Sequence, residues 1–128
     1  MAALEAFRRL GDSECQQIFS DFTDAAKHPL QERLDTIGQT GQSYLAWIRF
    51  VDAELRGRCL QSDVVAFTGP GSQVVSFCGD RFTRQINRGG LGRLATAIIH
   101  EELHSLGLGE NPPSSLEITR RVELRCGS

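Results

Sequence analysis

The sequence predicts an α+β fold, in which several helices pack on a small, mainly antiparallel sheet and one long helix is central. Apolar residues recur at helical spacing in several segments, and the longest such segment runs over residues 91–106. Two runs of branched and aromatic residues, 63–68 and 73–78, flank a Gly-Pro-Gly-Ser connection, which is typical of a β-hairpin. No internal repeat divides the 128 residues, so we expect residues 1–128 to form one domain.

Three helices are expected in the first third of the chain, over residues 2–10, 13–26 and 29–37. Each segment carries apolar side chains along one side at helical spacing. Residues 44–51 are rich in aromatic and branched side chains, which favours a third strand, with a helix as the alternative. The last helix is expected to begin after Ser114, because a Ser followed three residues later by a Glu is a capping box.

Composition and charge argue against two classes of partner. The net charge is −2 and the pI is about 5.9, so we expect neither nucleic acid nor a charged membrane surface as a partner. No run reaches the roughly 18–20 apolar residues that a membrane span needs. The segment Met1–Leu10 lacks the apolar core of a signal peptide. The protein is therefore expected to be either cytosolic or a mature segment with a new initiator Met.

The cysteines favour an oxidising compartment. Cys15, Cys59, Cys78 and Cys126 are widely spaced and contain no C-x-x-C pair, which is typical of disulfides rather than of a cysteine metal site. Of the three possible connectivities we expect Cys59–Cys78 with Cys15–Cys126. This favours an extracellular or periplasmic location. The alternative, four buried thiols in a cytosolic protein, stays open.

The long predicted helix contains the run His100-Glu101-Glu102-Leu103-His104. Residues four apart lie one above the other on a helix, so the two imidazoles can hold one metal ion, usually zinc. The Glu that follows the first His can take a proton from a zinc-bound water. Both histidines lie opposite the apolar side of the helix, so we expect them to face a cleft.

With the residues that follow, the run reads His-Glu-x-x-His-x-x-Gly-x-x-Glu, from His100 to Glu110. This pattern resembles the zincins, and among them the metzincin zinc metallopeptidases, in which a His or Asp at the last position is the third ligand. The resemblance covers residues 88–125. Two features depart from the family: Glu110 supplies a carboxylate at the last position, and the Met-turn is missing, because Met1 is the only methionine.

The resemblance implies a minimal zincin-like fold and zinc-dependent hydrolysis of peptide bonds. One Zn²⁺ would be held by His100, His104 and Glu110, and Glu101 would be the general base. The substrate would be a peptide or protein, whose extended backbone would pair with an antiparallel edge strand beside the cleft. Glu117 is the alternative third ligand, as in gluzincins, where a Glu comes from a later helix. The capping box gives Glu117 a structural explanation instead.

A second interpretation is not enzymatic: the same helix would carry a structural or vestigial zinc site in a protein-binding module. A closed structural site needs four protein ligands, and Glu117 or His28 would be the fourth. His28 has a simpler explanation as a histidine at a helix C-terminus. Glu102 falls within the apolar side of the metal helix, where a carboxylate needs an Arg partner, solvent access or a local distortion. We expect no catalytic role for Glu102.

Overall fold

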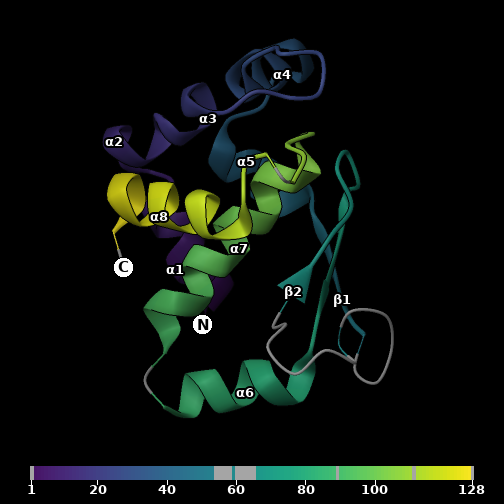
Figure 1. The fold of residues 1–128 in the computed structure, drawn as a ribbon. Coiled ribbons are helices and arrows are strands. Elements are labelled where there is room, and N and C mark those ends of the chain that lie inside the picture. The colour runs from purple at the N-terminus through teal and green to yellow at the C-terminus, as the bar shows by residue number, and fades with distance from the viewer. Residues whose placement is uncertain (1, 54–58, 60–65, 89, 111, 128) are drawn as a thin grey trace.

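The computed structural model describes residues 2–53, 59, 66–88, 90–110 and 112–127. The architecture is α+β, as predicted (Figure 1). The helices are α1 (Ala2–Arg9), α2 (Ser13–Gln16), α3 (Ile18–Asp21), α4 (Leu30–Ile37), α5 (Gly41–Trp47), α6 (Gly79–Asn87), α7 (Leu91–Ser105) and α8 (Ser115–Cys126). The strands are β1 (Arg49–Asp52), β2 (Ala66–Phe67) and β3 (Val74–Phe77).

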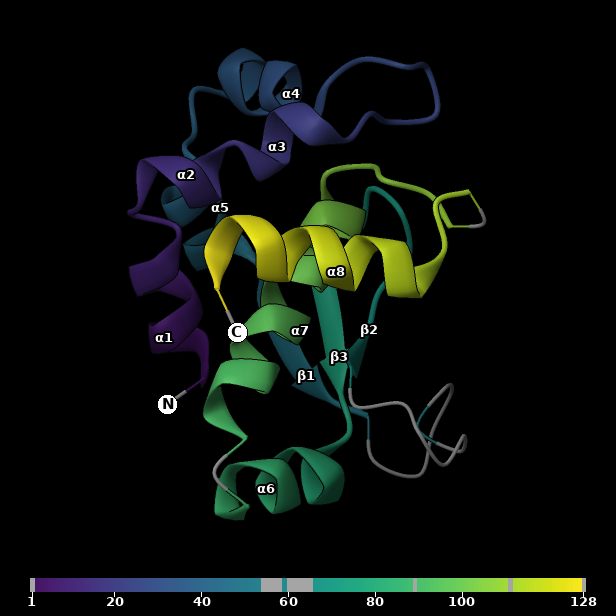
Figure 2. The same ribbon diagram turned by 60° about the vertical axis from the view of Figure 1, so that its left-hand side comes forward.

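Helix α7 is the central element, because it contacts α1, α6, α8 and the strands β2 and β3. Helix α8 crosses α7, and the sheet lies behind both helices in the view of Figure 2. The apolar side chains of α7 recur at helical spacing and are buried in the main core. This set consists of Leu94, Ala95, Ile98, Ile99 and Leu103. The predicted long helix and its apolar side are confirmed.

The sheet is mixed, whereas the sequence predicted a mainly antiparallel one. Its strand order is β1-β3-β2. Strand β2 pairs antiparallel with β3, which confirms the hairpin for the described residues, while residues 63–65 lie outside them. Strand β1 pairs parallel with β3, with Arg49 opposite Val74. The expectation failed because β1 does not lie next to β2, its neighbour in sequence, but on the far side of β3.

The first half of the predicted strand 44–51 is helical. Helix α5 begins after Thr40, whose side chain forms a capping box with Ser43. Tyr44 and Leu45 are buried in the core on this helix, and the strand begins only at Arg49. The capping signal outweighed the strand preference of the aromatic and branched side chains.

Two further helical predictions were wrong in part. The segment predicted as one helix over 13–26 forms two short helices, and Phe22 is already extended. The N-cap of α2 is Asp12, whose carboxylate accepts a hydrogen bond from the Glu14 N–H at 2.8 Å. Helix α6 was not predicted. The carboxylate of Asp52 accepts a hydrogen bond from the backbone N–H of Gly79 at its first turn, at 3.3 Å.

The other helix ends agree with the sequence. Helix α4 ends at Gly38, which has a φ of +69° and adopts the left-handed conformation that Gly allows. Helix α8 begins with the predicted capping box of Ser114 and Glu117. No helix in the described part of the chain combines the length and the apolar character that crossing a bilayer requires.

Both expected disulfides are present. Cys15–Cys126 joins α2 to the last residue of α8, and Cys59–Cys78 joins two segments near the sheet. The two disulfides are compatible with an extracellular location.

Candidate metal centre

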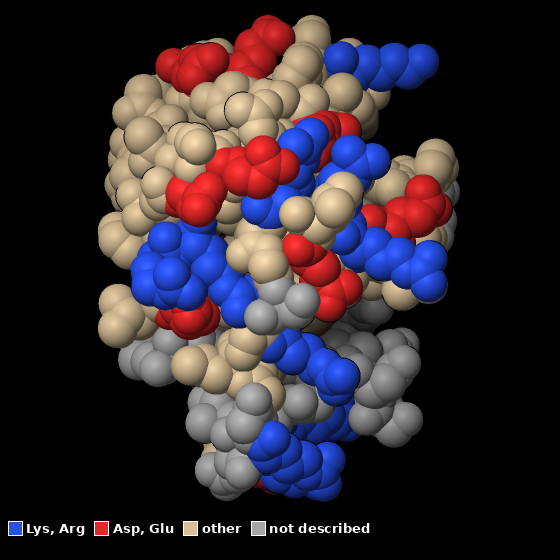
Figure 3. Space-filling view, turned by 90° about the vertical axis from the view of Figure 1, so that its left-hand side faces the viewer, with Lys and Arg blue, Asp and Glu red and all other residues tan. Residues whose placement is uncertain are grey.

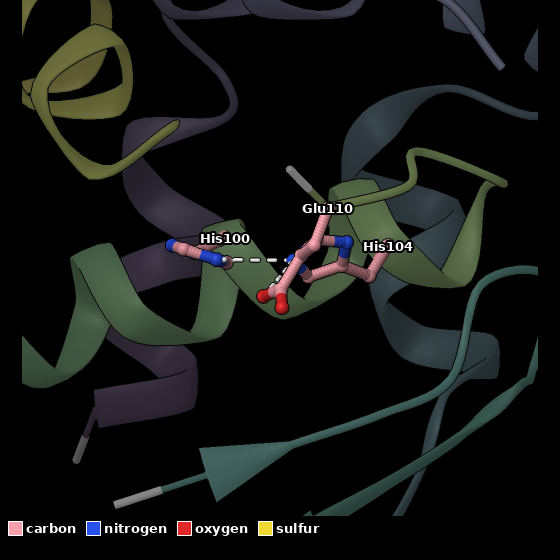
Figure 4. Close-up of side chains that lie close together, drawn as sticks. All are labelled: His100, His104 and Glu110. Carbon is pink, nitrogen blue, oxygen red and sulfur yellow. Dashed lines mark hydrogen bonds and ion pairs between the residues drawn. The ribbon is translucent and has the colours of Figure 1, made fainter. Parts of the chain in front are cut away.

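The two histidines of α7 and one carboxylate from the following loop meet at one point. His100 Nε2 lies 3.1 Å from His104 Nε2, and His104 Nε2 lies 3.2 Å from Glu110 Oε1 (Figure 4). All three residues offer a ligand atom within 4.8 Å of the others. The structure thus brings together the three residues that the sequence proposed as metal ligands.

The loop after α7 returns Glu110 to the histidines. The Gly107 N–H donates to the His104 carbonyl at 2.9 Å, and the Leu108 N–H donates to the Leu103 carbonyl at 3.1 Å, which closes the end of the helix. Gly107 has a φ of +117°, a conformation that residues with a Cβ rarely adopt. The Gly of the motif therefore lets the chain leave the helix and turn back, as expected from its spacing.

Each imidazole is held at its other nitrogen. His104 Nδ1 lies 2.7 Å from the carbonyl oxygen of Leu108. A carbonyl only accepts hydrogen bonds, so Nδ1 of His104 carries a proton and donates it. His100 Nδ1 lies 3.0 Å from the hydroxyl oxygen of Thr119 on α8. Such contacts orient metal-binding histidines and leave the opposite nitrogen available as a ligand.

The arrangement at Nε2 calls for a proton or a cation. In neutral His104 the Nε2 atom is a lone-pair acceptor, and it faces a second imidazole nitrogen and the carboxylate of Glu110. Lone pairs this close repel each other unless a proton or a cation lies among them. Zinc–nitrogen bonds of about 2.0–2.1 Å at tetrahedral angles would place two ligand atoms about 3.3–3.4 Å apart. The observed 3.1 and 3.2 Å are close to this spacing, and all three ligand atoms lie within 4.8 Å of one another, so these residues could hold one metal ion.

The two histidines are more buried than the sequence suggested. His100 is 6% exposed and His104 is 2% exposed, whereas the Glu110 side chain is 35% exposed. Both imidazoles are therefore largely covered by protein, and the cleft expected beside them stays a prediction. Helix α8, through Thr119, and the loop through Leu108 cover their outer sides. Glu110 is the most exposed of the three residues.

The alternative ligands lie elsewhere. Glu117 is exposed, and its Oε1 accepts a hydrogen bond from the Ser114 N–H at 3.3 Å in the capping box. The His28 side chain is 63% exposed and lies 3.9 Å from Asp24. Among the described residues, the group of potential metal ligands contains neither of them. The site consequently has three protein ligands in this part of the chain.

Glu101 and Glu102 occupy different sides of α7. Successive residues are rotated by about 100° around a helix, so Glu101 lies next to His100 and Glu102 lies on the far side. Glu101 is 8% exposed. Glu102 is fully buried, neither of its oxygens has a hydrogen-bond partner within the described ranges, and burial raises the pKa of its carboxyl well above the usual value. The Arg partner or solvent access expected for Glu102 is not found there.

Three contributors to the site were missed from the sequence: Leu108, Thr119 and Gly71. The Gly71 N–H, in the β2–β3 connection, donates to the His104 carbonyl at 2.9 Å. Strand β2 and the chain that follows it run below the three side chains in Figure 4. Of these three, only Thr119 could have been suspected from the sequence. It directly follows Ile118, which belongs to the apolar stripe that packs α8 against the core.

Tyr44 of α5 also lies against the end of α7: it is buried, with its hydroxyl 2.8 Å from Ser105 Oγ. This contact gives Tyr44 a packing role.

Comparison with known proteins gives no relative: no family model, no curated protein and no solved structure matches the chain. The function is therefore inferred from the side chains of the site, and not from the fold.

Proposed function

We propose that this protein is a small zincin-like, zinc-dependent metallopeptidase. The observation that carries the proposal is the meeting of His100 Nε2, His104 Nε2 and the Glu110 carboxylate at separations of 3.1 and 3.2 Å. Two nitrogens and one oxygen form a donor set typical of catalytic zinc. The contacts of Leu108 and Thr119 to the far nitrogens support metal binding, because ligand histidines commonly have such partners.

The number of ligands favours catalysis over a structural role. Structural zinc sites are closed by four protein ligands, while catalytic sites have three and keep one position for water or substrate. The potential ligand group found in the described residues has three members, and one of them, Glu110, is partly exposed. An open position on the solvent side is what a hydrolytic site requires.

Zinc and Glu101 would have separate roles in the reaction. Bound zinc would supply Lewis-acid activation of a water and of the scissile carbonyl. Glu101, directly after the first ligand, would accept the proton of the attacking water and deliver it to the leaving amine.

A peptide is the substrate class that the neighbouring strand supports. Strand β2 is an edge of the described sheet, is antiparallel to β3 and contacts the metal helix. A strand edge offers backbone N–H and C=O groups to an extended peptide. A peptide bound along this edge would run beside α7, where His100 and His104 lie.

One observation favours a second function. Both imidazoles are nearly fully buried, which also suits a structural zinc in a protein-binding module. In that case zinc would raise the stability of the fold but would not support cleavage.

Metal analysis combined with a digestion assay tests the proposal. The purified chain is stripped with a chelator, reloaded with zinc and incubated with a broad peptide library, and products are read by mass spectrometry. We expect one zinc per chain and cleavage only in the loaded form. His104→Ala should lose both zinc and cleavage, while His28→Ala, the same change at an exposed histidine, should keep both. Stoichiometric zinc without any cleavage would favour the structural function, and absence of zinc binding would remove both.

A further inference from the structure

Helix α8 touches the candidate metal centre through one side chain. Thr119 is half-buried, and its hydroxyl oxygen lies 3.0 Å from His100 Nδ1. The preceding residue, Ile118, is fully buried in the core. His104, by contrast, is held by Leu108, from the same loop that carries Glu110. The two ligand histidines are therefore oriented by different parts of the chain.

We propose that Thr119 is a positioning residue of the metal centre, because its hydroxyl holds the His100 ring with Nε2 directed at His104 and can accept the Nδ1 proton that the metal-binding tautomer of His100 carries. This inference rests on the metal binding proposed above. When the hydroxyl accepts a hydrogen bond from Nδ1, the proton of the neutral ring sits on Nδ1 and the lone pair sits on Nε2. In the other tautomer an N–H at Nε2 would point at His104 Nε2, 3.1 Å away, and would occupy the place of the metal.

The C-terminal end of α8 is firmly attached, which keeps the Thr119 hydroxyl in place. The Cys15–Cys126 disulfide joins it to α2. Arg125 donates from Nε to Asp21 at 2.8 Å and from Nη1 to Glu14 at 2.7 Å. Figure 3 views the molecule from the left-hand side of Figure 1, and acidic and basic side chains lie next to one another in its upper half. These links fix the helix that carries Thr119 relative to α2 and α3, so the hydroxyl is held before metal arrives.

Removing the hydroxyl without changing the shape of the side chain tests the role. Thr119→Val should weaken zinc affinity by about 10–100-fold, the usual cost of losing a group that orients a ligand histidine. Thr119→Ser keeps the hydroxyl and should bind zinc close to wild type. Thr36→Val is the matched control, because the Thr36 hydroxyl donates to the Glu32 carbonyl on α4, an element with no ligand residue. Affinity is measured by competition with a chromophoric chelator, and folding by thermal unfolding of the zinc-free proteins.

A second readout follows the protonation of His100 with and without zinc. The ¹⁵N chemical shifts of the imidazole nitrogens report which nitrogen of His100 carries the proton. In zinc-free wild type we expect this proton on Nε2, between the two imidazoles that lie 3.1 Å apart. In zinc-loaded wild type and Thr119→Ser we expect it on Nδ1, where the Thr119 hydroxyl can accept it. Zinc bound through Nδ1 of wild-type His100 would overturn the inference, as would equal zinc affinity of wild type and Thr119→Val. A wild-type chain that binds no zinc would instead overturn the proposed function.

Discussion

The metal side and the core side of α7 both carry buried polar groups, and the two histidines of the metal side are supported differently from Glu102 on the core side. On the metal side, the Nδ1 atoms of His100 and His104 have polar partners from other segments, and the Nε2 atoms meet at the Glu110 carboxylate. On the core side, Glu102 is fully buried, and its two oxygens have no hydrogen-bond partner in the described residues.

The difference shows how a built site is distinguished from an isolated buried charge. Orienting a buried polar group requires partners on other elements, and such partners indicate that the arrangement itself is used. A buried carboxyl without partners only lowers the stability of the fold or stays protonated. His100, Glu102 and His104 lie within five consecutive positions of α7. The rotation around the helix therefore places the histidines and Glu102 on different sides.

The largest expected effect is on the rate of cleavage, when the adjacent Glu101 and Glu102 are each replaced by Gln. Glu101→Gln should retain zinc and lower the cleavage rate by about 10²–10⁴-fold, because the amide cannot accept the proton of the water. Glu102→Gln should retain both zinc and cleavage, since it lies on the core side. Both variants are compared by zinc content and by single-turnover cleavage of a peptide found in the library digest. Equal loss of cleavage in the two variants would mean that the two sides of α7 do not differ in function.

The second prediction concerns which carboxylate belongs to the metal side. Glu110→Ala should weaken zinc affinity by more than the roughly 10–100-fold expected when a supporting partner is lost, because a direct ligand is removed. Glu117→Ala should leave zinc affinity unchanged and lower the free energy of unfolding by less than the roughly 0.5–2 kcal/mol that loss of an N-cap side chain costs, because only the bond from the Ser114 N–H is lost. Zinc titration and urea unfolding measure the two quantities. If only Glu117→Ala loses zinc, the third ligand is Glu117 on α8 and not Glu110.

The metal side was largely predictable from the sequence, because it follows from helical spacing. Positions 100 and 104 stack on any helix, and the Gly at 107 allows the turn that returns Glu110. The supporting contacts were not predictable in the same way. Thr119 is 19 residues from His100, and the Leu108 contact is made by a backbone carbonyl, which has no sequence signature.

The sheet side of the fold was predicted less well. The hairpin and the identity of the strands follow from local composition, but the order β1-β3-β2 depends on long-range pairing. Residues 44–47 read as strand by composition and fold as helix, because the Thr40–Ser43 capping box and burial of Tyr44 and Leu45 favour α5. Helix α6 has few apolar residues, so helical spacing gave no signal for it.

The smallest expected effect is on how the free energy of unfolding depends on pH, because Glu102 is buried on the core side. It is measured in zinc-free protein. Burial raises the pKa of Glu102 in the folded state above its value in the unfolded chain. The folded state therefore binds a proton that the unfolded state releases, and stability falls as the pH rises above about 4.5 towards the folded-state pKa. Each unit of pH in that window costs up to about 1.4 kcal/mol.

Glu102→Gln removes this titration and should flatten the dependence of unfolding free energy on pH. We expect the variant to gain stability relative to wild type as the pH rises from 5 to 8, by up to about 1.4 kcal/mol for each pH unit below the folded-state pKa of Glu102, because Gln stays neutral. Urea unfolding at both pH values gives the difference, and Glu123→Gln, the same change at an exposed position of α8, is the control. If wild type and Glu102→Gln show the same slope, Glu102 has a charge partner in the folded protein, and the two sides of α7 are more alike than their contacts indicate.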